Sequence, residues 1–368
     1  MRRLFAASLV GVVLAVSGAA QAQNKVVNVF NWSDYIDPSV LEDFTKETGI
    51  KVRYDVFDSN EVLETKLLAG KTGYDVVAPT GSFLQRQIKA GVFMPLDKSK
   101  LPNMQYLWPE IAERLAVYDP GGERAVNYMW GTTGIGYNVD EVKKRLGDIP
   151  MNTWDIIFKP EIISKLKDCG VYILDGPEEV IPSAMKYLGL NPDSKDPADI
   201  AKAGELLMKI RPYVKKFDSS GYINALARGD ICLALGWSGD VFQARTRAQE
   251  AAEKTKKPPV NVAYVIPKEG ALMWFDNFAI PKDAKNVDNA LTFINYMMRP
   301  EVAAKNSNYV SYASGNLEAQ KSIDEAILKN PAIYPDKETF DRLFIVTTNE
   351  PAVQRVITKT WNTFKRGK

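Results

Sequence analysis

Acidic side chains stand close to large aromatic rings at several points of this 368-residue chain. The segments 32–35, 237–240 and 274–276 each combine a Trp with an Asp, and the segment 177–180 carries two Glu residues without an adjacent ring. Each segment falls where we expect a strand to end or a helix to begin. Taken singly, such an acid caps a helix and such a ring packs in a core. Their recurrence favours a shared binding site.

These residue types favour a cationic guest with an apolar body. Carboxylates form charge-assisted hydrogen bonds with ammonium groups. Trp and Tyr rings cover a methylene chain and also attract its cationic ends. The four segments contain no Arg or Lys, which disfavours an anionic ligand.

The composition excludes several other chemistries. The chain has no histidine, which removes Ser-His and Cys-His catalytic pairs and the commonest metal ligand. Two cysteines without histidine are too few for a zinc site. We therefore expect no enzyme activity, no metal and no cofactor. Lys and Arg number 47 against 45 Asp and Glu, so nothing indicates nucleic acid or an anionic membrane as a partner.

Residues 1–22 have the three-part pattern of a secretory signal peptide: Arg2 and Arg3, an apolar stretch, and the small-residue site 20–22. The apolar stretch is short for a membrane-spanning helix, which needs about 20 residues. We expect a soluble protein exported to the periplasm. In that compartment Cys169 and Cys232 indicate a disulfide, with two separate buried thiols as the alternative.

The first hundred residues alternate strand and helix patterns. Apolar, β-branched runs predict strands over 26–30, 50–57 and 74–78, and helices follow each of them. Asp58 with Glu61 resembles a capping box that opens the second helix. This order predicts a mostly parallel sheet flanked by helices, which binds ligands beyond the carboxyl ends of its strands.

The rest of the chain again mixes strands and helices, and 368 residues exceed what one core serves. Helices are expected over 199–210 and 240–256. Three extended runs could cross between two domains: 130–137, 271–281 and 309–316.

Several stretches, spread in order over the mature chain, resemble the periplasmic polyamine-binding proteins of bacterial ABC importers. They are 29–36, 46–52, 54–64, 128–138, 236–240 and 266–271. The resemblance implies an α/β, two-lobed binding protein of type II that closes like a hinge. We expect one lobe to comprise 23–132 and 272–310, and the other 133–271 and 311–368.

The resemblance also implies a ligand set and a disulfide. Trp32 and Tyr35 would form an aromatic wall, Asp34 would hold an amine, and Glu179 matches the family carboxylate better than Glu178. The expected ligand residues are Trp32, Ser33, Asp34, Tyr35, Thr80, Ser82, Phe83, Glu179, Trp237, Asp240, Trp274, Asp276 and Tyr312. The pair Cys169 and Cys232 resembles the family disulfide.

Three positions depart from the pattern of the family, two of them with a bearing on ligand length and one at the protein surface. Trp274 stands where putrescine-type relatives have Phe, Asn277 stands where an apolar residue is expected, and Asp218 replaces a histidine. The expected function is capture of putrescine or spermidine by a monomer and delivery to an inner-membrane ABC permease. Two alternatives stay open: an iron(III) receptor of the same fold, with tyrosine and carboxylate ligands, and a carboxylate-based glycosidase.

Overall fold

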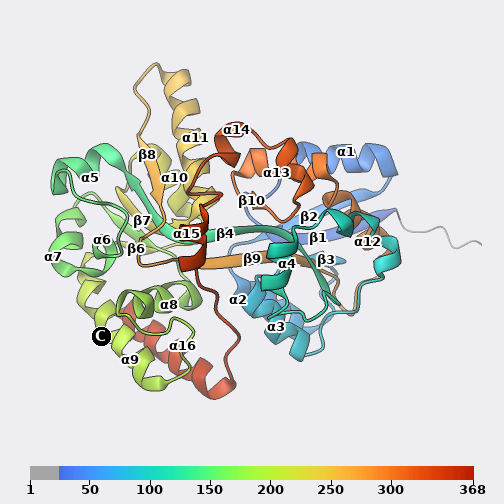
Figure 1. Ribbon diagram of the computed structural model, residues 1–368, viewed down its shortest axis with the longest axis horizontal. Helices are drawn as coiled ribbons and strands as arrows, with labels where there is room; N and C mark the ends of the chain where they lie inside the picture. Colours follow the sequence, from blue (N-terminus) through green and yellow to red (C-terminus); the bar gives the residue numbers. More distant parts are fainter. Residues whose placement is uncertain (1–24) are drawn as a thin grey trace, which may run out of the picture.

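The computed structural model describes residues 25–368, so the expected signal peptide 1–22 lies outside the described residues. The fold is α/β and is organised on one ten-stranded mixed sheet. Its strand order is β2-β1-β3-β9-β4-β7-β5-β6, and β8 and β10 pair with β4 outside this path. Figure 1 shows two lobes at the two ends of the long axis, with β4 and β9 running between them.

Lobe 1 is built on three parallel strands. β1 (Val26–Trp32) pairs with β2 (Lys51–Phe57) and β3 (Val76–Val77). The helices of this lobe are α1 (Pro38–Thr48), α2 (Asn60–Ala69), α3 (Gly81–Lys89), α4 (Pro109–Leu115), α12 (Val287–Met297) and α13 (Pro300–Val310). The predicted strands and helices are therefore present, which confirms the parallel βα arrangement expected for the first hundred residues.

One cap differs from the expected one. α2 is capped by Ser59, whose hydroxyl accepts from the Val62 backbone N–H at 3.3 Å, rather than by Asp58. The sequence pattern therefore predicted the N-cap of α2 one residue too early, at Asp58. The Asp58 side chain is consequently not engaged by the helix end.

Two long strands run between the lobes, and a third, short strand pairs with one of them. β4 (Ala125–Asn138) is antiparallel to β9 (Leu272–Ala279), and β10 (Ala313–Ser314) pairs with β4 at Met129 and Trp130. All eight residues of β9 are buried. Because β4 and β9 belong to both lobes, they join the two parallel sets of strands into a single sheet.

Lobe 2 carries the second parallel set, β7 (Leu233–Trp237), β5 (Val171–Ile173) and β6 (Lys216–Phe217). Antiparallel β8 (Val262–Val265) pairs with β4 beside it. Its helices include α5 (Val139–Leu146), α6 (Asp155–Phe158), α7 (Pro160–Ile163), α8 (Pro177–Tyr187), α9 (Pro197–Ile210), α10 (Gly221–Arg228), α11 (Ser238–Thr255) and α16 (Pro351–Arg366).

The disulfide pairing is confirmed, because Cys169 and Cys232 are bonded, with Cα atoms 5.5 Å apart. They precede the neighbouring strands β5 and β7.

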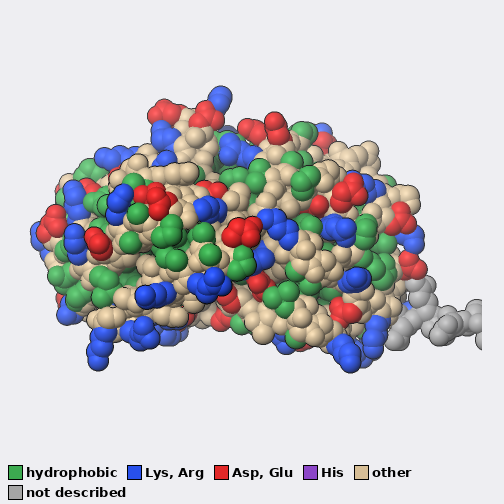
Figure 2. Space-filling view, turned by 90° about the horizontal axis from the view of Figure 1, so that it is seen from below, with side chains coloured by type: hydrophobic (Ala, Val, Ile, Leu, Met, Phe, Trp, Pro, Cys, Tyr) green, Lys and Arg blue, Asp and Glu red, His purple; other side chains and the backbone are tan. Residues whose placement is uncertain are grey.

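The cores of the two lobes are separate clusters of apolar side chains. The C-terminal helix α16 packs against α8 and α9 in lobe 2, as Figure 1 shows. The 3-10 turn Glu318–Lys321, which was expected in lobe 2, packs on α13 of lobe 1. There Ala319 joins the small apolar cluster of Ala303 and Ala304. The precise lobe boundaries expected from the sequence stay a prediction. On the face drawn in Figure 2, acidic, basic and apolar side chains are intermixed.

Candidate ligand-binding site

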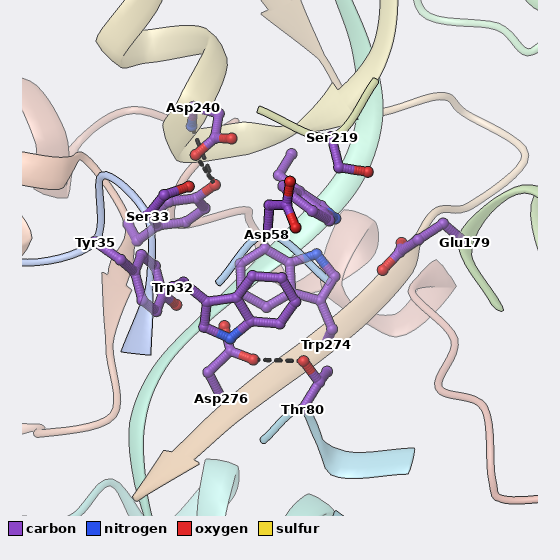
Figure 3. A pocket seen from close by; sticks show the side chains of 12 residues that line it. Trp32, Ser33, Tyr35, Asp58, Thr80, Glu179, Ser219, Asp240, Trp274 and Asp276 are labelled. Carbon is purple, nitrogen blue, oxygen red and sulfur yellow. Dashed lines mark hydrogen bonds between the residues drawn. The ribbon is translucent and has the colours of Figure 1, made fainter. Parts of the chain in front are cut away.

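A cavity of about 430 Å³ lies between the two lobes. Ten of its twelve lining residues were expected from the sequence, and Figure 3 shows how ten of the lining side chains converge. The full lining is Trp32, Ser33, Tyr35, Asp58, Thr80, Glu179, Ser219, Trp237, Asp240, Trp274, Asp276 and Tyr312.

The lobe 1 contribution begins where β1 ends. Trp32 is the last residue of β1, and its indole Nε1–H donates to the Ala78 carbonyl beyond β3 at 3.0 Å. The chain then turns at Asp34, whose φ of 53° lies in the left-handed region that Asp tolerates better than most residues. The next side chain, Tyr35, is thereby buried in the wall of the cavity. This is the carboxyl end of a parallel strand, as the sequence predicted.

Asp276 lies on β9, and its carboxylate is held by Thr80, which follows the end of β3. The Thr80 hydroxyl donates to Asp276 Oδ1 at 2.6 Å and itself accepts from Asn60 Nδ2 at 2.9 Å. The dashed line in Figure 3 marks the Thr80 bond. Asn277, the next residue on β9, points the other way, and its amide donates to the Phe275 carbonyl at 2.9 Å. Asn277 does not line the cavity, so its expected influence on ligand length is not through direct contact.

Asp240 and Glu179 come from first helical turns of lobe 2, Asp240 from α11 and Glu179 from α8. Asp240 accepts from the hydroxyls of Tyr312 at 2.7 Å and Tyr222 at 2.9 Å. The Thr133 hydroxyl of β4 donates to Glu179. The helix N-termini favour negative charge at both positions. Neither residue is the N-cap of its helix, since Trp237 and Gly176 hold those positions, and both carboxylates face the cavity.

The three enclosed carboxylates lie in surroundings that disfavour their charge. Burial raises the pKa values of Asp240, Asp276 and Glu179 each to about 7, although hydroxyl hydrogen bonds partly counteract it. The negative charge of Asp240 also raises the pKa of Asp276, since like charges repel. A cationic ligand would reverse this cost by pairing with the ionised form. The electrostatics of the cavity therefore match a guest with positive charges.

Aromatic rings surround the space between these carboxylates. Trp32 of lobe 1 meets Trp237 of lobe 2 edge-to-face, with ring centroids 5.6 Å apart. Trp274 meets Tyr312 at 5.3 Å, and Tyr35 packs on Tyr312 at 5.1 Å. Such surfaces cover a hydrocarbon chain and attract cationic groups over their faces.

Three expected ligand residues do not line this cavity. The Asp34 carboxylate pairs with Arg247 of α11 at 2.5 Å. Ser82 donates to Glu178 at 3.1 Å, and the Phe83 ring packs under the Arg86 guanidinium at 4.3 Å. Ser82 and Phe83 line a smaller adjoining pocket.

The same contacts show that the lobes are closed on each other. Asp34 of lobe 1 reaches Arg247 of lobe 2, while Arg86 of lobe 1 reaches Glu178 of lobe 2 at 3.4 Å. Glu178 is thus used for closure, and its neighbour Glu179 is left to face the cavity. Of the two glutamates, Glu179 lines this cavity, and its expected role as a ligand residue stays a prediction.

Sequence reasoning missed two lining residues, Asp58 and Ser219. Asp58 directly follows β2, so the rule that selected the ends of β1 and β3 could have found it, had it not been assigned to a helix cap. Ser219 had no such signal. It follows Asp218, which pairs with Lys216 and accepts from the Ser220 backbone N–H at 3.0 Å.

The fold and this site define the class of protein. Residues 39–335 match the family model of the bacterial extracellular solute-binding proteins, and the chain belongs to that family. Membership of the polyamine-binding group, predicted from the sequence resemblance, is confirmed by relatives whose similarity spans the whole chain.

The chain is 53% identical to the putrescine-binding periplasmic protein SpuD of Pseudomonas aeruginosa, over all of both chains. It is 52% identical to the putrescine-binding periplasmic protein PotF of Escherichia coli, covering 97% of this chain and 96% of PotF. Among solved structures, the spermidine/putrescine substrate-binding protein PotD of Streptococcus pneumoniae superposes with a TM-score of 0.74 at 32% identity. That match covers 93% of this chain and 99% of PotD.

Proposed function

We propose that this protein is a periplasmic receptor that captures putrescine, spermidine or both between its lobes. The observation that carries the proposal is the enclosure of Asp240, Asp276 and Glu179 among tryptophan and tyrosine rings without an Arg or Lys in the cavity lining. The enclosed carboxylates would bind ammonium groups, and the rings would cover the methylene chain. The names of SpuD and PotF, which state putrescine binding, support the same ligand class.

In this proposal the ligand drives closure, because only the closed form contacts it from both lobes. Asp276 and Thr80 would hold the ligand on the lobe 1 side, and Asp240 and Glu179 on the lobe 2 side. The closed surface would then be presented to an inner-membrane ABC permease by a monomer. Export through the signal peptide 1–22 belongs to the same proposal. Within residues 25–368, no helix combines the length and apolarity needed to cross a membrane.

The iron(III) alternative fits the tyrosines of this site poorly. Iron(III) is bound by phenolate oxygens, whereas Tyr312 and Tyr222 donate their hydroxyl protons to Asp240. Burial and the nearby Asp240 raise the pKa values of both tyrosines well above their usual value, which favours the phenol.

The glycosidase alternative requires carboxylates as acid and base beside a sugar. The family to which the chain belongs consists of solute-binding proteins, which supports binding without turnover. We therefore propose that the protein is not an enzyme. A screen of glycosides at neutral pH that detects hydrolysis would contradict this.

Isothermal titration of the ligand-free protein with a series of diamines, triamines and tetraamines tests the proposal. We expect saturable binding of putrescine or spermidine at one site. A monoamine of the same carbon number as putrescine is the matched control, because it keeps the methylene chain and lacks the second charge. Failure of every polyamine to bind, or equal binding of the monoamine, would refute the proposal.

A further inference from the structure

A second, larger cavity opens beside the ligand cavity. It has an empty volume of about 1,220 Å³ and lies between the β2–α2 turn of lobe 1 and the segment around β6 in lobe 2. Asp58 and Ser219 line both cavities, so the two spaces meet at these residues. We call the second space the outer cavity; its lining also includes Glu61, Asp175 and Asp218.

The carboxylates of the outer cavity differ in whether they already have a cation. Asp175 pairs with Lys365 at 2.8 Å, and Asp218 pairs with Lys216. Across residues 25–368, by contrast, neither Asp58 nor Glu61 forms an ion pair through its carboxylate. Asp58 therefore carries the unpaired negative charge next to the opening into the ligand cavity, while burial raises the pKa of Glu61 to about 7 and Lys216 and Lys365 line the lobe 2 side.

Asp58 is free to face the ligand because of local structure. Ser59, rather than Asp58, caps α2. The backbone of the preceding residue, Phe57, is held in place because its carbonyl accepts a hydrogen bond from the Ser33 N–H at 2.9 Å. Figure 3 shows the Asp58 and Ser219 side chains on the far side of the Trp32 indole from Asp276 and Thr80. Ser219 is fixed by its own contact, since its hydroxyl accepts from the Asp175 N–H at 3.0 Å.

We infer that Asp58 and Ser219, with Glu61 further out, form an additional subsite that binds the extra amino group of a triamine or tetraamine. This inference rests on the proposed polyamine function and deepens it. A diamine would be bound entirely among Asp240, Asp276 and Glu179. A longer polyamine would extend past the Trp rings and place a further ammonium group beside Asp58. The subsite then sets the affinity for long polyamines relative to putrescine.

The test compares ligands of different charge on matched variants. Asp58→Asn removes the charge and keeps the shape. Asp55→Asn is the control, because it makes the same change in net charge, and Asp55, which lies on β2 just before Asp58, lines neither cavity. Glu61→Gln is a second test variant. Isothermal titration with putrescine, spermidine and spermine, at low and at physiological salt, gives the affinities, and circular dichroism checks that each variant is folded.

We expect Asp58→Asn to weaken spermidine and spermine binding about two- to fivefold more than it weakens putrescine binding, the size of one solvent-accessible charge pair. Glu61→Gln should act in the same direction and more weakly. The loss should shrink at higher salt, because exposed charges are screened. Equal losses for all three ligands, no loss for spermine, or the same loss in Asp55→Asn would overturn the inference. If the wild-type protein bound none of these ligands, the proposed function itself would fail.

Discussion

The substitution Asp240→Asn isolates the charge of one carboxylate in the ligand cavity. The side chain is only 6% exposed, and both oxygens accept hydrogen bonds from tyrosine hydroxyls, Oδ1 from Tyr312 and Oδ2 from Tyr222. An Asn side chain keeps the shape and retains one carbonyl oxygen as an acceptor. It cannot supply the negative charge to an ammonium group.

The expected loss of affinity follows from burial and ionisation. Removing one partner of a buried, hydrogen-bonded charge pair costs about 2–5 kcal/mol. Because about 1.4 kcal/mol corresponds to a factor of ten, putrescine and spermidine should bind roughly 30- to 4,000-fold more weakly. With a pKa of about 7, Asp240 is half ionised at neutral pH. Ionising it therefore costs only about 0.4 kcal/mol, too little to offset this loss.

Isothermal titration at pH 7.5 measures the affinity, and thermal unfolding measures the stability of the ligand-free variant. One tyrosine hydroxyl loses its acceptor in Asp240→Asn, which costs about 1–3 kcal/mol, while the relief of a buried charge acts in the opposite direction. The melting temperature should therefore change little compared with binding. Asp55→Asn serves again as the control. If Asp240→Asn bound putrescine and spermidine within threefold of wild type, the assignment of Asp240 to the amine would be wrong.

Three further predictions concern pH and packing. The pKa values near 7 mean that the affinity for polyamines should fall as the pH drops from 8 to 6, since the three enclosed carboxylates take up protons; titrations that showed constant affinity over this range would contradict it. These pKa values exceed the value of about 4 in the unfolded chain. Between about pH 4 and 7 the ligand-free folded state therefore binds more protons than the unfolded state. The carboxylates' contribution to stability is consequently present below pH 4 and is lost as the pH rises through 7. Melting curves should show a smaller loss over this range in Asp240→Asn than in wild type. Gly239→Ala would place a Cβ 2.4 Å from the Tyr312 ring. This overlap should destabilise the protein by about 1–3 kcal/mol and weaken polyamine binding. Unchanged melting and titration curves would refute the packing argument.

Local sequence patterns determined the elements of the fold and the positions of the candidate ligand residues within them. The strand-helix order of the first hundred residues predicts a parallel sheet, and the carboxyl ends of such strands lie at one edge. Trp32 at the end of β1 and Thr80 after β3 are found there. Asp240 could be recognised as a candidate because it follows a tryptophan at a helix start, and Glu179 because it stands beside a second glutamate at a helix start. The family resemblance added which of these positions belong to one site.

Only the tertiary structure decided which charged side chains face the cavity. Asp34 and Arg247 are 213 residues apart in sequence, and their ion pair takes the Asp34 carboxylate out of the lining. Asp58 enters the lining because Ser59 caps α2, and Ser219 of lobe 2 enters because closure brings lobe 1 against it. A pattern of residues specifies the element and its face, but the partner that a long side chain finds depends on contacts between distant segments. The aromatic and acidic clusters were therefore visible in the sequence, while the direction of each carboxylate required the closed arrangement of both lobes.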